Sequence, residues 1–299
     1  MKRQKLVDIA ALLLTVAASL SAALSEQERN DIDRLAGTKG AWTAAENVHK
    51  VSFPRTDLKV VVDGTPLHPF MGLTSWAAFT GGGDHVMVMG DLALVEDEVN
   101  AVMSVALENG LEVTALHNHF FFDRPRAMFM HIGGMGSAEK LAASVRQCID
   151  KIADIRKRAP EPATSFRGLN IPAKSSITPA PLEQILGVKG QANNGMYKVS
   201  IGRAAKAHGH PIGNQMGVNT WAAFAGSDER AFVDGDFAML TSELQNVLKT
   251  LRRAGITIVA IHNHMTHEQP QYVFLHYWGT GRAADLAKAV KAAADTQNR

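Results

Sequence analysis

The sequence contains the same domain twice. Residues 71–145 align without a gap on residues 216–290, at a constant offset of 145 positions, and 27 of the 75 aligned residues are identical. Unrelated segments would share only about one residue in fifteen, so the similarity reflects a tandem duplication. The identical stretches include Trp76-Ala-Ala-Phe79 on Trp221-Ala-Ala-Phe224 and His117-Asn-His119 on His262-Asn-His264. Both halves are therefore expected to fold alike.

Length and composition agree with two domains. The chain has 299 residues, 46% of them hydrophobic, which is enough for a buried core in each half. We place the first repeat at residues 26–155 and the second at 181–299. Residues 156–180 form a linker, because five of the 11 prolines lie between positions 160 and 181. The basic run at 156–158 beside this linker is interpreted as a solvated helix end.

The first 25 residues predict a secretory signal. Lys2, Arg3 and Lys5 precede an apolar stretch at 9–24, and small residues at 21–23 suit cleavage. The stretch has 16 residues, fewer than the ~20 that a membrane-spanning helix needs. An uncleaved N-terminal anchor is the alternative. We expect a periplasmic or secreted protein without a stable membrane span after the signal is removed.

The charge of the mature chain argues against nucleic-acid binding. Removing residues 1–23 takes away three of the 31 basic and one of the 29 acidic residues, which leaves 28 of each. Affinity for phosphates requires clustered Lys and Arg, which the chain lacks. Cys148 is the single cysteine, so no internal disulfide can form, and its helical spacing with Leu141, Val145 and Ile152 predicts a buried position.

Within each repeat the pattern predicts an α+β fold. Short β-favouring runs at 58–62, 76–79 and 85–89 come first. Helical spacing follows from Glu98 to Leu107, with Gly110 as the stop signal. Strand character returns at 111–119 and 127–132, and a second helix starts near Ser137. We expect two tandem repeats, each a largely antiparallel sheet with helices on one face.

The recurring histidines are the candidate ligands. On a strand, His117 and His119 share one face, and a hairpin through 120–126 would bring His131 beside them. An acid from the loop could complete each set. Imidazoles with a carboxylate or water suit Zn, Cu, Mn or Fe. The predicted metal ligands are His117, His119, Asp123 and His131 in the first repeat and His262, His264, Glu268 and His276 in the second, with His267 as an optional ligand.

Two other interpretations of the histidines stay open at this point. They can be structural, bonded only to the backbone, in a binding module without metal. They can also act as general bases beside a carboxylate. The candidate catalytic carboxylates are Asp91, Glu98, Asp236 and Glu243. For Asp91, capping of the following helix is the simpler role, and Glu98 and Glu243 suit the dipole at a helix start.

Two family resemblances follow from these motifs. His-x-His followed by an acid resembles the first metal motif of cupins, although a helix before that strand does not suit a jelly roll. The His-Asn-His pair, with Gly-Asp before the helix and Phe-x-His after the hairpin, resembles the LppY/LpqO-like family of exported bacterial proteins of unknown function. The resemblance implies a cell-envelope or secreted setting and no established activity. The mycobacterial members are lipoproteins, whereas here no cysteine lies near the cleavage region.

We therefore expect a protein that binds a transition metal or a small ligand at one His set per repeat. The alternative is a metal-dependent or His/carboxylate-dependent hydrolase or lyase acting on cell-envelope material. The two sites should differ. The first has an apolar rim, Phe120-Phe-Phe122, whereas the second has Met265-Thr-His267, which suits a soft metal better. Protein partners are not indicated by the sequence.

Overall fold

The structure is a computed structural model that describes residues 23–166 and 168–297. Residues 1–22, which carry most of the predicted signal, lie outside the described residues. Among the described residues, no helix is both long and apolar enough to cross a membrane.

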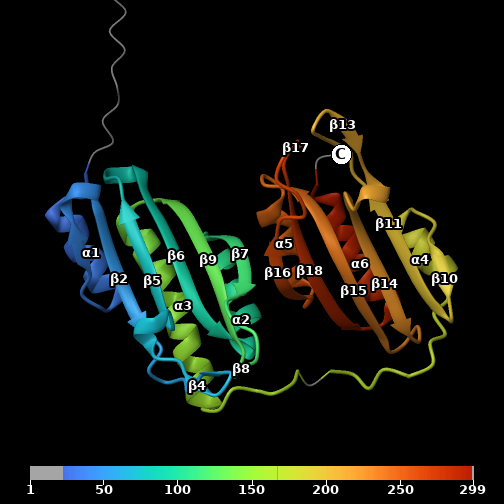
Figure 1. The fold of residues 1–299 in the computed structure, drawn as a ribbon, viewed down its shortest axis with the longest axis horizontal. Helices are drawn as coiled ribbons and strands as arrows, with labels where there is room; N and C mark the ends of the chain where they lie inside the picture. The colour runs from blue at the N-terminus through green and yellow to red at the C-terminus, as the bar shows by residue number, and fades with distance from the viewer. Residues whose placement is uncertain (1–22, 167, 298–299) are drawn as a thin grey trace, which may run out of the picture.

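One antiparallel sheet of twelve strands runs through the molecule (Figure 1). Six strands come from the first repeat: β1 (Ala41–Thr43), β2 (Val48–Pro54), β5 (Thr74–Thr80), β6 (Val86–Val95), β7 (Glu112–Asn118) and β9 (Ala127–Gly136). Their counterparts are β10 (Gln191–Asn193), β11 (Met196–Gly202), β14 (Asn219–Gly226), β15 (Ala231–Leu240), β16 (Thr257–His262) and β18 (Tyr272–Gly281). The order β1-β2-β5-β6-β9-β7-β16-β18-β15-β14-β11-β10 repeats itself outward from the centre.

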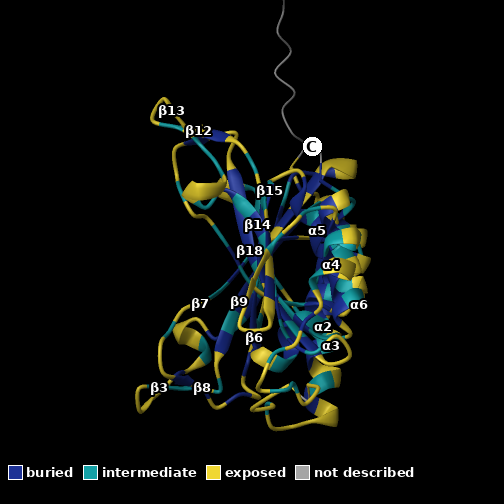
Figure 2. Ribbon diagram, turned by 90° about the vertical axis from the view of Figure 1, so that its right-hand side faces the viewer, coloured by how far each residue is buried: buried dark blue, intermediate teal, exposed yellow. Residues whose placement is uncertain are grey.

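The helices cover one face of this sheet (Figures 1 and 2). They are α1 (Glu26–Ala36), α2 (Glu96–Glu108) and α3 (Ala138–Arg158) in the first repeat, and α4 (Pro179–Leu186), α5 (Leu244–Arg253) and α6 (Ala283–Asp295) in the second. The predicted α+β class, with two tandem repeats and helices on one face, is confirmed. A single sheet with helices on one side is not a jelly roll.

Two small sheets project from the opposite face (Figure 2). One consists of β3 (Val61–Val62), β4 (Thr65–Pro66) and β8 (Asp123–Arg124). The other consists of β12 (Ala205–Ala207), β13 (His210–Ile212) and β17 (Glu268–Gln269). Short 3-10 turns occupy Ala44–Glu46, Pro69–Met71, Gly83–His85 and Asn214–Met216. The open face of the main sheet therefore lies between two projecting hairpins.

The apolar patterns place the core between sheet and helices. Strands β5 and β14 alternate regularly between buried and half-buried residues, and Ala77 and Phe79 point toward the helices. The predicted face of α2 is buried at Val99, Val102, Met103, Ala106 and Leu107. Burying one Leu, Val or Met side chain contributes about 1.5–3 kcal/mol, so this face anchors the helix.

Cys148 and the basic run of α3 both lie on that helix's packed side. The predicted burial of Cys148 is confirmed, and burial raises the pKa of its thiol to about 12. The prediction that residues 156–158 form a solvated helix end is wrong for Arg156. Its side chain is buried and lies 2.5 Å from Asp97 Oδ2 and 3.0 Å from Glu98 Oε1, because α3 packs against the start of α2.

Asp91 does not cap a helix, contrary to the simpler expectation. Strand β6 continues for four residues past it, to Val95, and α2 begins at Glu96. Glycine before the aspartate is required for packing: a Cβ at Gly235, the counterpart of Gly90, would lie 2.3 Å from the Tyr277 ring. The Gly-Asp pair is therefore part of a long strand, and Asp91 faces His131 across the ladder.

The repeats meet at the middle of the sheet through a pseudo-symmetric junction. Strands β7 and β16 pair at one position, Leu116 with Ile261, which are equivalent residues of the two repeats. Asn100 of α2 donates to the Ile258 carbonyl (3.0 Å) and accepts from the Ile258 amide (2.8 Å). Gln245 of α5 makes the same two bonds with Val113, at 2.9 and 3.0 Å. Each amide side chain thus provides hydrogen-bond partners for the backbone N–H and C=O groups that a β-bulge of the other repeat leaves unpaired.

Removing either amide should weaken this junction. We expect Asn100→Ala and Gln245→Ala each to lower the free energy of unfolding by about 1–3 kcal/mol, because buried backbone groups lose their partners. Urea unfolding followed by circular dichroism measures the change. Asn246→Ala, an exposed neighbour of Gln245, is the control and should leave stability unchanged. An equal loss in the control would contradict the role assigned to the junction.

Candidate metal centre at the open face of the sheet

The histidine sets lie on the sheet face that carries no helices. His117 is the penultimate residue of β7 and His262 the last of β16, and His119 and His264 follow in the hairpin loops. Side-chain alternation sends Leu116 and Ile261 into the core and turns His117 and His262 to the open face. His131 on β9 and His276 on β18 share that face, each directly opposite an aspartate, Asp91 or Asp236.

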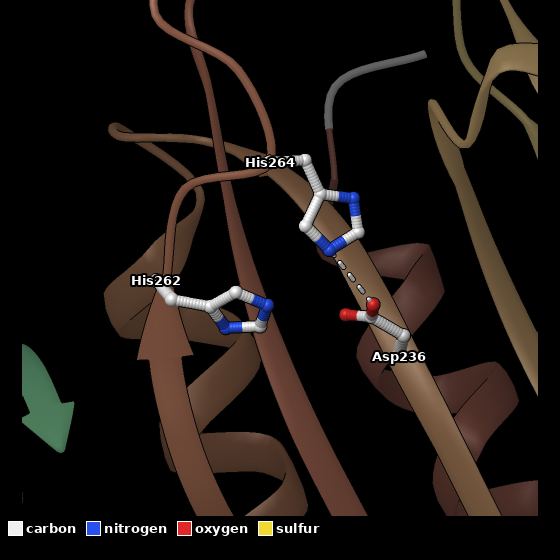
Figure 3. Close-up of side chains that lie close together, drawn as sticks. All are labelled: Asp236, His262 and His264. Carbon is white, nitrogen blue, oxygen red and sulfur yellow. Dashed lines mark ion pairs between the residues drawn. The ribbon is translucent and has the colours of Figure 1, made fainter. Parts of the chain in front are cut away.

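In the second repeat three side chains converge (Figure 3). One donor atom each from Asp236, His262 and His264 lies within 4.8 Å of the others. His264 Nε2 is 3.3 Å from Asp236 Oδ2, and His276 Nδ1 lies 3.8 Å from the same oxygen. The rings of His262 and His276 stack with centroids 4.6 Å apart. His264 is held by stacking on Phe274 at 3.5 Å.

The Asp236, His262 and His264 group contains a buried carboxyl and buried polar atoms that make no hydrogen bond. Asp236 is 3% exposed, and burial raises the pKa of its carboxyl to about 7. Burial, with two neighbouring histidines, lowers the pKa of His262 to about 4. Among the described residues, Asp236 Oδ1 and His262 Nδ1 are buried and have no hydrogen-bond partner. Such atoms are rare in native proteins, because each costs about 1–3 kcal/mol.

The first repeat builds a related but different arrangement. His131 Nε2 lies 3.0 Å from His117 Nε2, so two imidazoles share one hydrogen bond. His119 stacks on Phe129 at 3.5 Å, as His264 does on Phe274, and burial lowers its pKa. Asp91 Oδ1 is buried without a partner among the described residues. The ligand atoms of Asp91, His117 and His119 do not all lie within 4.8 Å of one another, as those of the second repeat do.

Asp123 and Glu268, the two loop acids predicted as metal ligands, bind backbone amides in the structure. Asp123 Oδ2 accepts from the Ala127 amide at 2.6 Å, and Glu268 Oε1 accepts from the Tyr272 amide at 3.0 Å. Both residues are buried at the base of the projecting hairpins, where they order the turn into the next strand. The structure does not bring Glu268 into the converging group. His267 lies in the same loop, its ring 5.1 Å from that of His208.

Glu98 and Glu243 are engaged by arginines. Glu98 is fully buried, forms two 2.8 Å bonds with Arg55 and accepts from the Val95 amide at 2.9 Å. Glu243 repeats the pattern with Arg203 at 3.1 Å and the Leu240 amide at 2.9 Å. A buried carboxylate that is paired and also caps a helix start is structural. The structure thus separates these two acids from Asp91 and Asp236, which face histidines.

A groove between the repeats reaches both histidine sets. Its volume is about 540 Å³, and its wall includes His117 from the first repeat and His262 from the second. Phe121, Phe166 and Trp278 supply an apolar lining, and Arg126 adds a cationic side chain to it. The sequence analysis missed this groove, because it depends on the junction of β7 with β16. The available signal was the recurrence of a histidine directly after Leu116 and after Ile261.

The buried carboxyl makes stability depend on pH in the metal-free protein. The folded pKa of Asp236, about 7, is above its ordinary value of 3.8, so stability is lost as pH rises through this range. Asp236→Asn cannot ionise. Its unfolding free energy relative to the wild type should therefore increase between about pH 4.5 and 7.5, by on the order of 2 kcal/mol.

Urea unfolding with a chelator present, at several pH values, tests this expectation. The lowered pKa of His262 costs stability as pH falls from 6.5 toward 4 in both proteins, so it cancels in the comparison. Asp84→Asn, at an exposed loop position, is the control and should show no such trend. A difference between Asp236→Asn and the wild type that does not change with pH would contradict the buried, uncompensated carboxyl.

We compared the chain with known protein families, curated proteins and solved structures. No curated protein matches the chain significantly. A solved structure, a trimeric bacterial microcompartment shell protein named PduB, aligns over 86% of this chain and 89% of that chain, at 12% identity and a TM-score of 0.20, too low to support an argument. The narrower LppY/LpqO-like assignment stays a prediction. A family model described as Domain of Unknown Function (DUF1259) matches residues 30–151 and again 180–296, most of the chain, and the protein therefore belongs to this family and carries its domain twice.

Proposed function

We propose that the protein is exported and binds a transition metal ion in its second repeat, through Asp236, His262 and His264. The observation that carries the proposal is the buried Asp236 carboxyl, which faces two histidines and, among the described residues, has no cationic Arg or Lys partner. An isolated buried carboxylate is costly, and a bound cation offsets that cost. Glu98 and Glu243, which have arginines, show how this fold otherwise compensates buried acids.

The donor set suits a transition metal. Two imidazoles and one carboxylate form a shell used for Zn, Mn, Fe or Cu, and the neutral imidazole is the ligating form. The lowered pKa of His262 keeps its ring neutral at physiological pH. His276, 3.8 Å from the Asp236 oxygen, is the nearest further ligand, and His267 stays an optional one. The first repeat, whose two imidazoles already bond each other, should bind metal more weakly.

Export rests on the sequence of residues 1–25. Its basic start and short apolar stretch support a periplasmic or secreted location. In that setting a surface site with three protein ligands suits sequestration or sensing of a metal ion.

Metal analysis of tag-free protein tests this proposal. After loading with Zn²⁺, Cu²⁺ or Mn²⁺ and desalting, we expect about one equivalent per chain. His262→Ala/His264→Ala should lose it, whereas His117→Ala/His119→Ala should keep most of it. The control is His68→Ala/His210→Ala, two exposed histidines outside the sets. Less than about a tenth of an equivalent in the wild type would overturn the proposal. Equal loss in both site variants would overturn the asymmetry.

The groove favours a second candidate function, metal-assisted hydrolysis of cell-envelope material. His262 belongs both to the converging group and to the groove wall, so a bound molecule would lie beside the metal site. Three protein ligands leave a coordination position for water or substrate, which is typical of catalytic rather than structural zinc sites. The bound ion would supply Lewis-acid polarisation, while Trp278 and Phe121 would hold the apolar part of the substrate.

Hydrolysis of p-nitrophenyl esters and phosphate esters by the metal-loaded protein tests this candidate. We expect turnover that Asp236→Asn reduces by at least about tenfold. Trp278→Ala should raise KM with little change in kcat, because it removes apolar surface that would hold the substrate and leaves the metal ligands in place. The control is Phe70→Ala, because Phe70 is fully exposed and does not line the groove. Turnover that is equal in the wild type and Asp236→Asn would refute the catalytic role and leave metal binding to be judged by metal content.

A further inference from the structure

Three methionines are exposed together on the open face of the first repeat. Met87 and Met89 on β6 and Met135 on β9 are 38, 57 and 63% exposed. Large apolar side chains in neighbouring positions on a sheet surface lose the stabilisation of burial, so a group of them calls for an explanation. What the three share chemically is a soft thioether sulfur.

The register of the sheet brings these side chains together. Met87 pairs directly with Met135, which places their Cβ atoms about 4.5–5.5 Å apart. Met89 is two residues further along the same face and is diagonal to Met135. Its own cross-strand neighbours are Ala78 and Gly133, which are small and leave room for its side chain to turn. Unbranched and flexible, the three side chains can direct their sulfur atoms to one point.

The second repeat shows that the fold does not require methionine here. At the offset of 145 the equivalent residues are Phe232, Asp234 and Thr280, on strands of the same register. An aspartate replaces Met89, so the position does not need an apolar side chain. At these three positions only the first repeat has thioether side chains, and the fold does not require them.

The methionines also lead toward the histidine set of that repeat. Along β6 the same face continues from Met89 to Asp91, which is opposite His131. His131 in turn is bonded to His117. The methionine sulfurs and the imidazoles of this repeat therefore lie on the same exposed face, separated along β6 by two residues.

We propose that Met87, Met89 and Met135 bind a soft monovalent cation of the Cu(I) class. Thioether sulfur selects Cu(I) over the harder divalent ions, because both partners are soft and uncharged ligands suit a singly charged ion. The site is independent of the Asp236 centre in the second repeat, which has oxygen and nitrogen donors. The first repeat accepts the soft ion at its methionines, and His131, two residues from Gly133 on β9, lies diagonal to Met89 on the same face.

The test is a competition titration with a chromogenic Cu(I) chelator, under ascorbate and without oxygen, on the tag-free full chain. Met87→Leu/Met89→Leu/Met135→Leu keeps size and apolar character and should weaken Cu(I) binding by at least about tenfold. The matched control is Met71→Leu/Met196→Leu/Met216→Leu, three methionines that are 56, 41 and 67% exposed elsewhere. It should bind Cu(I) as the wild type does. Ag⁺, titrated by calorimetry, should follow the same order.

X-ray absorption of the Cu(I) form supplies a second, structural readout. We expect sulfur scatterers bound directly to copper in the wild type and their loss in the methionine variant. Scatterers that are only nitrogen or oxygen, or an equal loss of affinity in both triple variants, would overturn the proposal. So would binding of a partner protein at this patch with no Cu(I) bound. The methionine variant should keep the Zn²⁺ content of the wild type, so failure here and failure of the second-repeat metal site are distinguishable.

Discussion

The pairing of Leu116 with Ile261 is the contact on which the molecule depends. One residue pair would be a weak connection between two sheets. It is reinforced by Asn100 and Gln245, whose amides each make two hydrogen bonds to a bulge of the opposite repeat. Because the amide satisfies both a donor and an acceptor of buried backbone, it replaces a rung of the ladder. Two six-stranded sheets become one, and the groove that joins the histidine sets arises at their junction.

The acids at the sheet differ in whether an arginine compensates their charge. Each repeat buries one glutamate at the start of a helix and pairs it with an arginine, Arg55 or Arg203. Each repeat also places one aspartate against histidines on the open face, and there the described residues provide no arginine. Removing water from a carboxylate is costly, and in our proposal a bound ion offsets that cost in the second arrangement. This contrast, more than the histidines themselves, indicates where an ion would bind.

Duplication allowed the two open faces to diverge while the cores stayed alike. Glycines, the Trp-Ala-Ala-Phe strands and the buried helix faces recur because packing and turns require them. On the exposed face the constraint is weaker. There the first repeat has methionines and a triple phenylalanine, whereas the second has Asp234, Trp278 and a more polar loop. In our proposals the harder ion is held in the second repeat and the softer one in the first.

The sequence did not predict α1, α4, β1 or β2, and it placed His119 on a strand although that residue lies in the loop after β7. What the sequence determined by itself is the duplication, the order of strands and helices from residue 76 to the helix that starts near Ser137, the buried face of α2 and the position of His117 on the open face. These follow from local periodicity and from identity at a fixed offset. Tertiary structure decided the rest. Arg55 and Arg203 lie 43 and 40 residues from the glutamates that they pair with, and Asp236 meets His264 across β18, so no local pattern reveals either contact. The loop acids Asp123 and Glu268 have the spacing of ligands. In the structure, however, their carboxylates accept hydrogen bonds from backbone amides that need an acceptor. Long-range pairing, which spacing cannot encode, determined which carboxylates stay available to a ligand.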